Sequence, residues 1–217
     1  MDPRLELHML RTADGHTLEA ELRVATDPRA GMVLCHPHPQ YGGTMRSIVI
    51  SALFDALPRV GVTCLRFNFR GVEGSEGRYD EGRGERHDVH AALGALDAQL
   101  SAAVPVVLTG WSFGADVALS TADPRLAAWL AIAPPLRFVT EGGAAARDPR
   151  PKHLVLAEHD EFRRPVDVAA EVATWPATTV EVVAGASHFF VGRTEQVVGA
   201  AAVLVDRLAG PAAPPAG

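Results

Sequence analysis

The stretch VLTGWSFGADVAL, residues 107–119, decides how the rest of the chain is interpreted. An apolar run ends at a Gly-x-Ser-x-Gly motif centred on Ser112, and small and apolar residues follow at helical spacing. This order predicts a buried strand, a tight turn and a helix. A strained turn needs neighbours without side chains, which Gly110 and Gly114 provide. A plain helix cap would not need them. We therefore interpret Ser112 as a nucleophile with a helix N-terminus behind it.

The composition of the 217 residues is that of a folded, water-soluble protein, with 47% apolar and 21% charged residues. A net charge of −6 argues against a nucleic-acid partner. The first ten residues lack the apolar core of a signal peptide, and no apolar run is long enough to span a bilayer. Cys35 and Cys64 lie in strand-like runs, as buried reduced thiols do. We expect a cytoplasmic protein without membrane partners.

Strand-like and helix-like segments alternate along the chain, which predicts βαβ units around a mostly parallel sheet. Asp14-Gly15 indicates an antiparallel hairpin at one edge, giving about eight strands in all. The alanines of 125–133 leave a helix open as an alternative to a strand there. We expect one α/β domain over residues 1–209 and a disordered Pro/Ala tail over 210–217. The predicted strands are 5–11, 16–25, 30–37, 62–69, 104–110, 125–133, 152–160 and 178–186, and the predicted helices 45–61, 85–100, 112–122, 163–174 and 193–210.

Two further strand ends carry the residues that a serine nucleophile needs. Enzymes on parallel sheets work at the carboxyl ends of the strands. Asp160 directly follows the strand KHLVLAEH, where a carboxylate that orients a base is expected, with Glu158 and Glu161 as nearby competitors. His188 lies in the loop after the last strand. The order Ser112, Asp160, His188, each at a strand end, predicts a catalytic triad.

The stretches HPHPQYGGTMRSIVI, LRFNFRGVEGSEG, GWSFGA and GASHFF make the chain resemble the α/β-hydrolase superfamily over nearly its whole length. More narrowly, it is similar to the small lidless bacterial hydrolases of the dienelactone-hydrolase-like type. The resemblance implies an α/β-hydrolase fold without a cap domain. Dienelactone hydrolases use a cysteine nucleophile, so their substrate is not carried over to a chain with Ser112.

The resemblance also implies an oxyanion hole of two backbone N–H groups. One belongs to Phe113, directly after the nucleophile, and the other to the loop after Cys35. The glycine position of that loop is Pro37 here, and proline has no N–H. The resemblance favours His38 as the second donor, with Gln40 and Tyr41 as alternatives.

The predicted reaction is transfer of an acyl group from a small molecule to water, without a metal or organic cofactor. Residues 134–151, PPLRFVTEGGAAARDPRP, are too few for a cap of two or more helices. An open site with little apolar wall favours short, water-soluble esters or thioesters. The pattern does not name the natural substrate or the oligomeric state.

Two other functions compete with this prediction. His36 and His38 stand two residues apart after a strand, as in some metal-dependent hydrolases, although the other histidines show no matching ligand spacing. A catalytically silent binding protein on the same fold is the second alternative.

Arginines also gather around the second and third loops of the predicted fold, where they could bind an anionic group or pair with neighbouring acids. They are Arg46, Arg66, Arg70, Arg78, Arg83 and Arg86, and the candidate partners are Glu73, Glu76, Asp80, Glu81 and Glu85.

Overall fold

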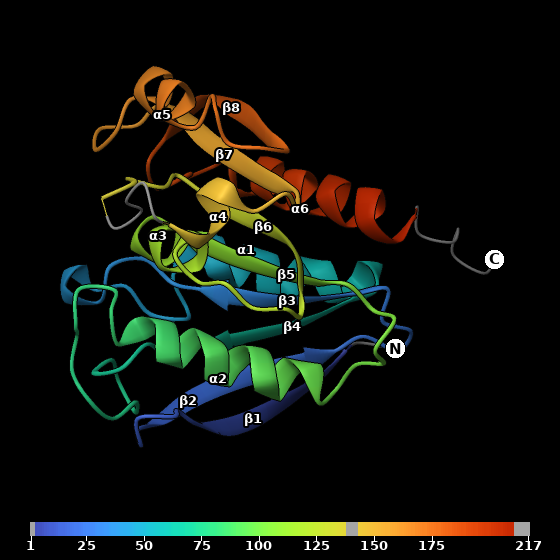
Figure 1. Cartoon of the computed structure of the whole chain (residues 1–217). Coiled ribbons are helices and arrows are strands. Elements are labelled where there is room, and N and C mark those ends of the chain that lie inside the picture. The colour runs from blue at the N-terminus through green and yellow to red at the C-terminus, as the bar shows by residue number, and fades with distance from the viewer. Residues whose placement is uncertain (1–2, 138–142, 211–217) are drawn as a thin grey trace.

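One eight-stranded sheet forms the middle layer of the molecule, in the order β1-β2-β4-β3-β5-β6-β7-β8 (Figure 1). The computed structural model describes residues 3–137 and 143–210. Strands β3 to β8 run parallel, while β1 and β2 form an antiparallel hairpin at one edge. The strands are β1 (Arg4–Arg11), β2 (Thr17–Val24), β3 (Ala30–Cys35), β4 (Val62–Phe67), β5 (Val106–Trp111), β6 (Leu126–Ile132), β7 (Lys152–His159) and β8 (Thr178–Ser187).

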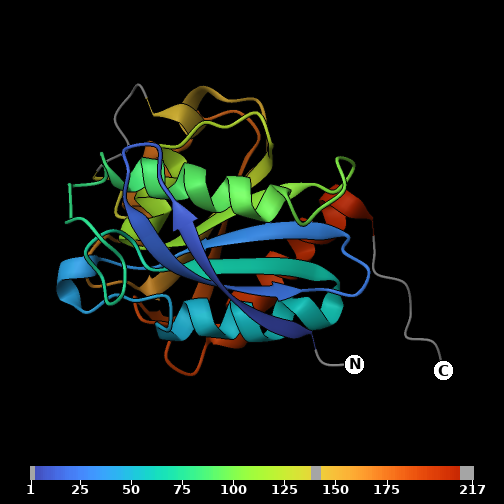
Figure 2. The same cartoon turned by 90° about the horizontal axis from the view of Figure 1, so that it is seen from below.

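Helices cover both faces of the sheet, as its apolar central strands require (Figure 2). Apolar side chains of α1 and α6 belong to the core on one face, and those of α2, α3, α4 and α5 to the core on the other. The helices are α1 (Ile48–Ala56), α2 (Glu85–Asp97), α3 (Phe113–Leu119), α4 (Ala144–Arg147), α5 (Pro165–Glu171) and α6 (Thr194–Ala209), with 3₁₀ turns η1 (Pro39–Tyr41) and η2 (Leu57–Val60).

The predicted architecture is confirmed, with local differences. Residues 125–133 form strand β6 and not a helix, because Trp129 and its neighbours are buried between both layers. The helix predicted over 45–61 starts only at Ile48 and ends in the 3₁₀ turn η2, where Gly61 adopts a φ of 83°. Gly15, with a φ of 94°, makes the hairpin turn that Asp-Gly predicts.

The segment 134–151 contains α4, a helix of four residues, in its described part. Residues 138–142 of this segment lie outside the described residues, as do residues 211–217 of the predicted tail. Cys35 and Cys64 are buried free thiols, as predicted. Among the described residues, no helix is both long and apolar enough to cross a membrane.

Candidate active site

Ser112 stands at a sharp turn between β5 and α3, with φ 55° and ψ −120°. A Cβ atom on Gly110 would overlap the backbone of Gly114, and one on Gly114 would overlap the carbonyl of Cys35. The two glycines are therefore required because β5, α3 and the end of β3 pack backbone against backbone. The Ser112 side chain makes no capping hydrogen bond to its own helix, and its N–H donates to the Ile132 carbonyl at 2.8 Å. Its hydroxyl is thus available to another partner.

That partner is His188, which follows β8. The distance from Ser112 Oγ to His188 Nε2 is 2.9 Å, and His188 Nδ1 lies 2.8 Å from Asp160 Oδ2. Three residues separated by up to 76 positions in the chain thus form one hydrogen-bonded line. The His188 side chain is only 7% exposed and that of Asp160 only 5%, whereas Ser112 is partly accessible. The serine is therefore the member of the line that a dissolved molecule can reach.

Asp160 is held by the turn that follows β7. Its Oδ1 accepts hydrogen bonds from the N–H groups of Phe162 at 2.9 Å and Arg163 at 3.1 Å, which aims Oδ2 at His188. Burial alone would raise the pKa of Asp160, but the hydrogen bond and charge of His188, together with these backbone donors, lower it below its ordinary value. The carboxylate therefore stays ionised beside the imidazole.

The two competing acids have other partners. Glu158 Oε2 accepts the N–H of Gly185 at 2.7 Å, and Glu161 Oε2 accepts the backbone N–H of His188 at 3.0 Å. Neither is hydrogen-bonded to the imidazole. Glu161 nevertheless fixes the backbone of His188, a positioning role that the sequence analysis did not assign.

Aromatic residues contact the loop of His188 and fix its position, a role that was not predicted from the sequence. The Trp111 indole Nε1–H donates to the His188 carbonyl at 3.1 Å, so the residue before the nucleophile ties down the candidate base. The Phe162 ring lies 4.6 Å from the imidazole, measured between centroids. Phe190, buried with a φ of 52°, closes the turn after His188. In the sequence, these contacts are indicated only by the aromatic residues of GWS (110–112) and SHFF (187–190).

The loop after β3 lies against the start of α3. Cys35 is in register with Gly110, and the His38 ring is 5.1 Å from that of Phe113. Of the three predicted second donors, Gln40 gives its N–H to His38 Nδ1 and Tyr41 gives its N–H to the His38 carbonyl. Both are thus engaged inside the turn η1, so His38 N–H remains the candidate, together with Phe113 N–H.

The buried His36 side chain fixes the backbone of this loop. The buried ring accepts the Phe69 N–H at Nε2, 3.0 Å away, so Nδ1 carries the proton and donates to the Pro37 carbonyl. Burial lowers the pKa of His36 to about 4, against a small opposing effect of the Pro37 hydrogen bond. Both ring nitrogens are occupied by the protein. Within residues 3–137 and 143–210, no three His, Cys, Asp or Glu side chains are grouped as metal ligands.

Most of the loop arginines are paired with acids, partly with partners that the sequence analysis did not consider. Arg66 binds Glu21, and Arg70 binds Asp14 and Asp88. Arg46 also reaches Glu21 and Glu73, while Arg83 binds Asp80 and Glu81.

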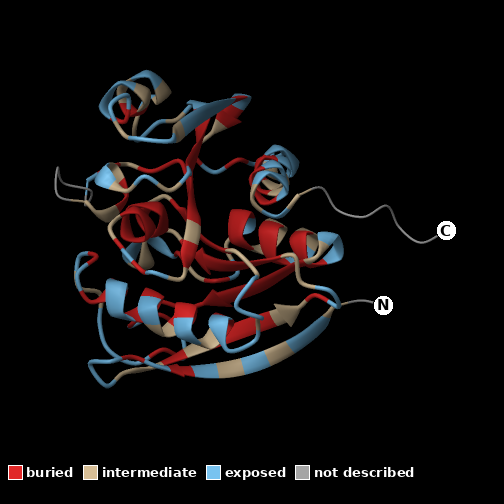
Figure 3. Cartoon of the chain, turned by 45° about the vertical axis from the view of Figure 1, so that its right-hand side comes forward, coloured by how far each residue is buried: buried red, intermediate tan, exposed pale blue. Residues whose placement is uncertain are grey.

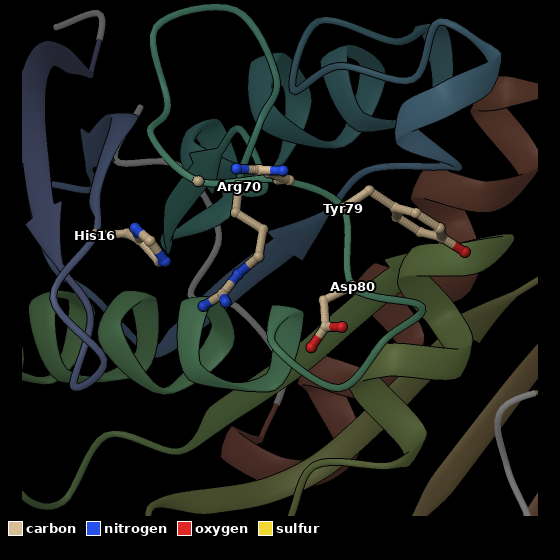
Figure 4. A pocket seen from close by; sticks show the side chains of 6 residues that line it. His16, Arg70, Tyr79 and Asp80 are labelled. Carbon is tan, nitrogen blue, oxygen red and sulfur yellow. The ribbon is translucent and has the colours of Figure 1, made fainter.

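A pocket of about 590 Å³ opens beside Arg70, lined by His16, Gly77, Arg78, Tyr79 and Asp80 (Figure 4). The Tyr79 side chain points away from His16 and Arg70 in this view, and its hydroxyl lies 3.2 Å from His38 Nε2. Tyr79 thus lines this pocket and also contacts the loop that carries His38.

Known proteins share this fold and are similar to this chain in sequence, although no family model matches the chain. An uncharacterized protein of Rickettsia prowazekii is 33% identical over 190 residues, which cover 82% of this chain and 80% of that protein. A solved α/β serine hydrolase homologue from Coxiella burnetii is 34% identical, with a TM-score of 0.78 and coverage of 94% of this chain and 97% of that one. An α/β serine hydrolase without a lid from Xanthomonas campestris is 27% identical, with a TM-score of 0.81 and 97% of each chain covered. The chain therefore belongs to the α/β-hydrolase family, among its small members without a lid.

Proposed function

We propose that this hydrolase cleaves short, water-soluble carboxylic esters or thioesters through Ser112, His188 and Asp160. The observation that carries the proposal is the unbroken line from Ser112 Oγ to His188 Nε2 at 2.9 Å and from His188 Nδ1 to Asp160 Oδ2 at 2.8 Å. Nucleophile, base and orienting carboxylate thus stand in hydrogen-bond contact, the arrangement that activates a serine.

In the proposed reaction, His188 Nε2 takes the Ser112 proton as Oγ attacks the substrate carbonyl. The ionised Asp160 holds the Nδ1–H tautomer and stabilises the imidazolium that forms. The N–H groups of Phe113 and His38 donate hydrogen bonds to the developing oxyanion, a type of contact worth about 3 kcal/mol per donor. His188 then protonates the leaving group and activates the water that releases the acid from Ser112.

The proposed substrate size follows from the surroundings of the site. Phe162 and Phe189, near His188, are 56% and 48% exposed, and α4 is the only helix in the described part of 134–151. A long acyl chain would find little enclosing apolar surface there, although each buried methylene would contribute about 0.8 kcal/mol. Short acyl groups have few methylene groups to bury and therefore lose the least binding energy at such an open site. We place the reaction in the cytoplasm, consistent with two buried, unpaired cysteines.

A panel of p-nitrophenyl esters with two to sixteen acyl carbons, joined by matched thioesters, tests the proposal. We expect kcat/KM to be highest for the shortest acyl groups and to show no jump above the micelle threshold. Ser112→Ala and His188→Ala should each lower kcat by about 10³-fold or more, and the double variant should lose little further. Unchanged turnover in Ser112→Ala would refute the proposed nucleophile, and a steady rise to the longest chains would refute the proposed substrate class.

A further inference from the structure

The free edge of the sheet at β1 carries an apolar strip that the molecule itself leaves uncovered (Figure 3). Leu5, Leu7 and Met9 alternate along the strand and are 48%, 79% and 64% exposed. They share a face with Glu21 and Arg23 of β2, to which Leu7 and Leu5 are paired. On the opposite face of the strand, Leu10 is buried in the core that contains α2.

The backbone of these same three residues points away from the sheet. The Thr12 N–H donates to the His16 carbonyl, so the even-numbered residues of β1 bond toward β2. The Asn68 N–H donates to the Glu19 carbonyl on the other side of β2, which gives the same alternation. The N–H and carbonyl groups of Leu5, Leu7 and Met9 are therefore directed outward, where a further strand would bond.

Proteins usually protect such an edge with charged side chains, a bulge or a proline within the strand. Strand β1 has an uninterrupted register over its eight residues, and its charged side chains stand at its ends (Arg4 and Arg11) or on the opposite face (Glu6), away from the apolar strip. The other edge, β8, differs. Its register shifts near its end, and Gly185 takes a φ of 66° there. The β1 edge is thus regular over its whole length, whereas the β8 edge is regular only over residues 178–183.

The sequence of β1 is complementary to itself. When two copies of RLELHMLR run antiparallel with Leu7 opposite Leu7, Leu5 faces Met9, and Glu6 faces His8 at two symmetric places. A pairing centred on Glu6 would instead place two carboxylates opposite each other, and one centred on His8 would place Glu6 opposite Leu10. A glutamate facing a histidine can accept a hydrogen bond from the imidazole, whereas two facing carboxylates destabilise a strand pair.

We propose that a second copy of this chain binds here, joining β1 to β1 about a two-fold axis at Leu7, so that the two eight-stranded sheets become one. Leu5, Leu7 and Met9 of each copy then supply six backbone hydrogen bonds and one shared apolar cluster. Glu6 and His8 lie on the other face; within one strand His8 Nε2 is 3.4 Å from Glu6 Oε2, and in the dimer each also faces its counterpart in the second copy. Such an isologous contact closes on itself and stops at a dimer. The proposal is independent of the catalytic role of Ser112.

Sedimentation velocity of the full chain over a concentration series tests it. We expect the mass to rise from the 23.0 kDa of the monomer to twice that value. Leu7→Lys, which places like charges on the axis, should weaken association about tenfold or more. Val182→Lys, at a 49% exposed apolar residue of the β8 edge, should leave it unchanged. Circular dichroism and Tm should confirm that both variants fold.

The register is tested by charge exchange. Glu6→Lys should weaken the dimer, and the double variant Glu6→Lys/His8→Glu should restore it, because opposite charges then face each other. A wild-type chain that stays monomeric at millimolar concentration would overturn the proposal. So would a dimer that is broken by Val182→Lys and not by Leu7→Lys, or a double variant no better than Glu6→Lys.

Discussion

The turn at Ser112 and the arginine-rich loop after β4 lie at the same end of the sheet but are built in opposite ways. At Ser112, backbone meets backbone, and Gly110 and Gly114 leave no room for even one extra carbon. In the exposed part of the loop, charged side chains pair at the surface, as Arg83 does with Asp80 and Glu81, whereas the pair of Arg70 with Asp88 is buried. A turn without room for an added side-chain atom does not tolerate substitution of its glycines. An exposed ion pair, in contrast, contributes little to the free energy of unfolding. The following predictions measure that difference.

The largest effect is expected at Asp160. In Asp160→Asn, the amide oxygen can still accept the Phe162 and Arg163 N–H groups, which leaves the NH₂ group facing His188 Nδ1. The imidazole must then accept there and carry its proton on Nε2, where it cannot take the Ser112 proton. We expect kcat to fall about 10³- to 10⁴-fold at unchanged fold. Glu158→Gln is the matched control. A larger loss in this control would assign the orienting carboxylate to Glu158.

The next effect concerns the glycines. Gly114→Ala places a Cβ on the carbonyls of Cys35 and His36, which are backbone atoms and cannot rotate away. We expect the free energy of unfolding to fall by at least about 3 kcal/mol, measured by urea denaturation. Gly199→Ala is the control, because Gly199 lies in α6 with open space around its Cα. It should raise stability by up to about 1 kcal/mol. Similar values for the two variants would contradict the steric account.

The third prediction concerns pH and His36. The unfolded chain binds a proton near pH 6.5, but the buried ring does so only near pH 4. Its contribution to stability is therefore present above pH 6.5 and is lost as the pH falls toward 4. The ceiling is about 3 kcal/mol.

Urea titrations at pH 7 and pH 4.5 should show this loss in the wild type. The loss should be smaller in His36→Gln and unchanged in the exposed control His87→Gln. Equal pH dependence in all three proteins would show that His36 is not buried in its neutral form.

The smallest effect is expected in the arginine-rich loop. Arg83→Ala removes two exposed ion pairs and should change the free energy of unfolding by no more than about 0.5 kcal/mol. Arg66→Ala should cost several times more, because it removes two hydrogen bonds to the buried carboxylate of Glu21 and leaves it only the half-exposed Arg46. Equal losses of unfolding free energy in Arg83→Ala and Arg66→Ala, measured by urea denaturation, would mean that the exposed ion pairs stabilise the protein as much as the buried one does.

The same contrast explains what could be predicted from the sequence. Local sequence patterns are enough to predict the conformation where residues adjacent in the sequence determine it. Examples are the glycines around Ser112, the Asp14-Gly15 turn and the apolar strands. Contacts between distant residues leave no local signal. The Arg66–Glu21 pair spans 45 positions, and the Trp111 bond to the His188 carbonyl spans 77.

The position directly after the strand favoured Asp160 over Glu158 and Glu161, but it did not show what holds that side chain in place. Its Oδ1 is held by the backbone N–H groups of Phe162 and Arg163, in a turn that the spacing of the acids does not reveal. The fold was therefore predictable to the level of its strands and helices. The arrangement that orients His188 was not.

Covalent labelling of the folded protein tests the central claim most directly. A fluorophosphonate reacts only with a serine that a neighbouring base activates, and peptide mapping by mass spectrometry locates the adduct. We expect a single adduct on Ser112, no labelling of Ser112→Ala, and strongly slowed labelling of His188→Ala. An adduct on any other residue, or a folded wild-type protein that resists labelling altogether, would contradict the claim that Ser112, His188 and Asp160 form an active triad.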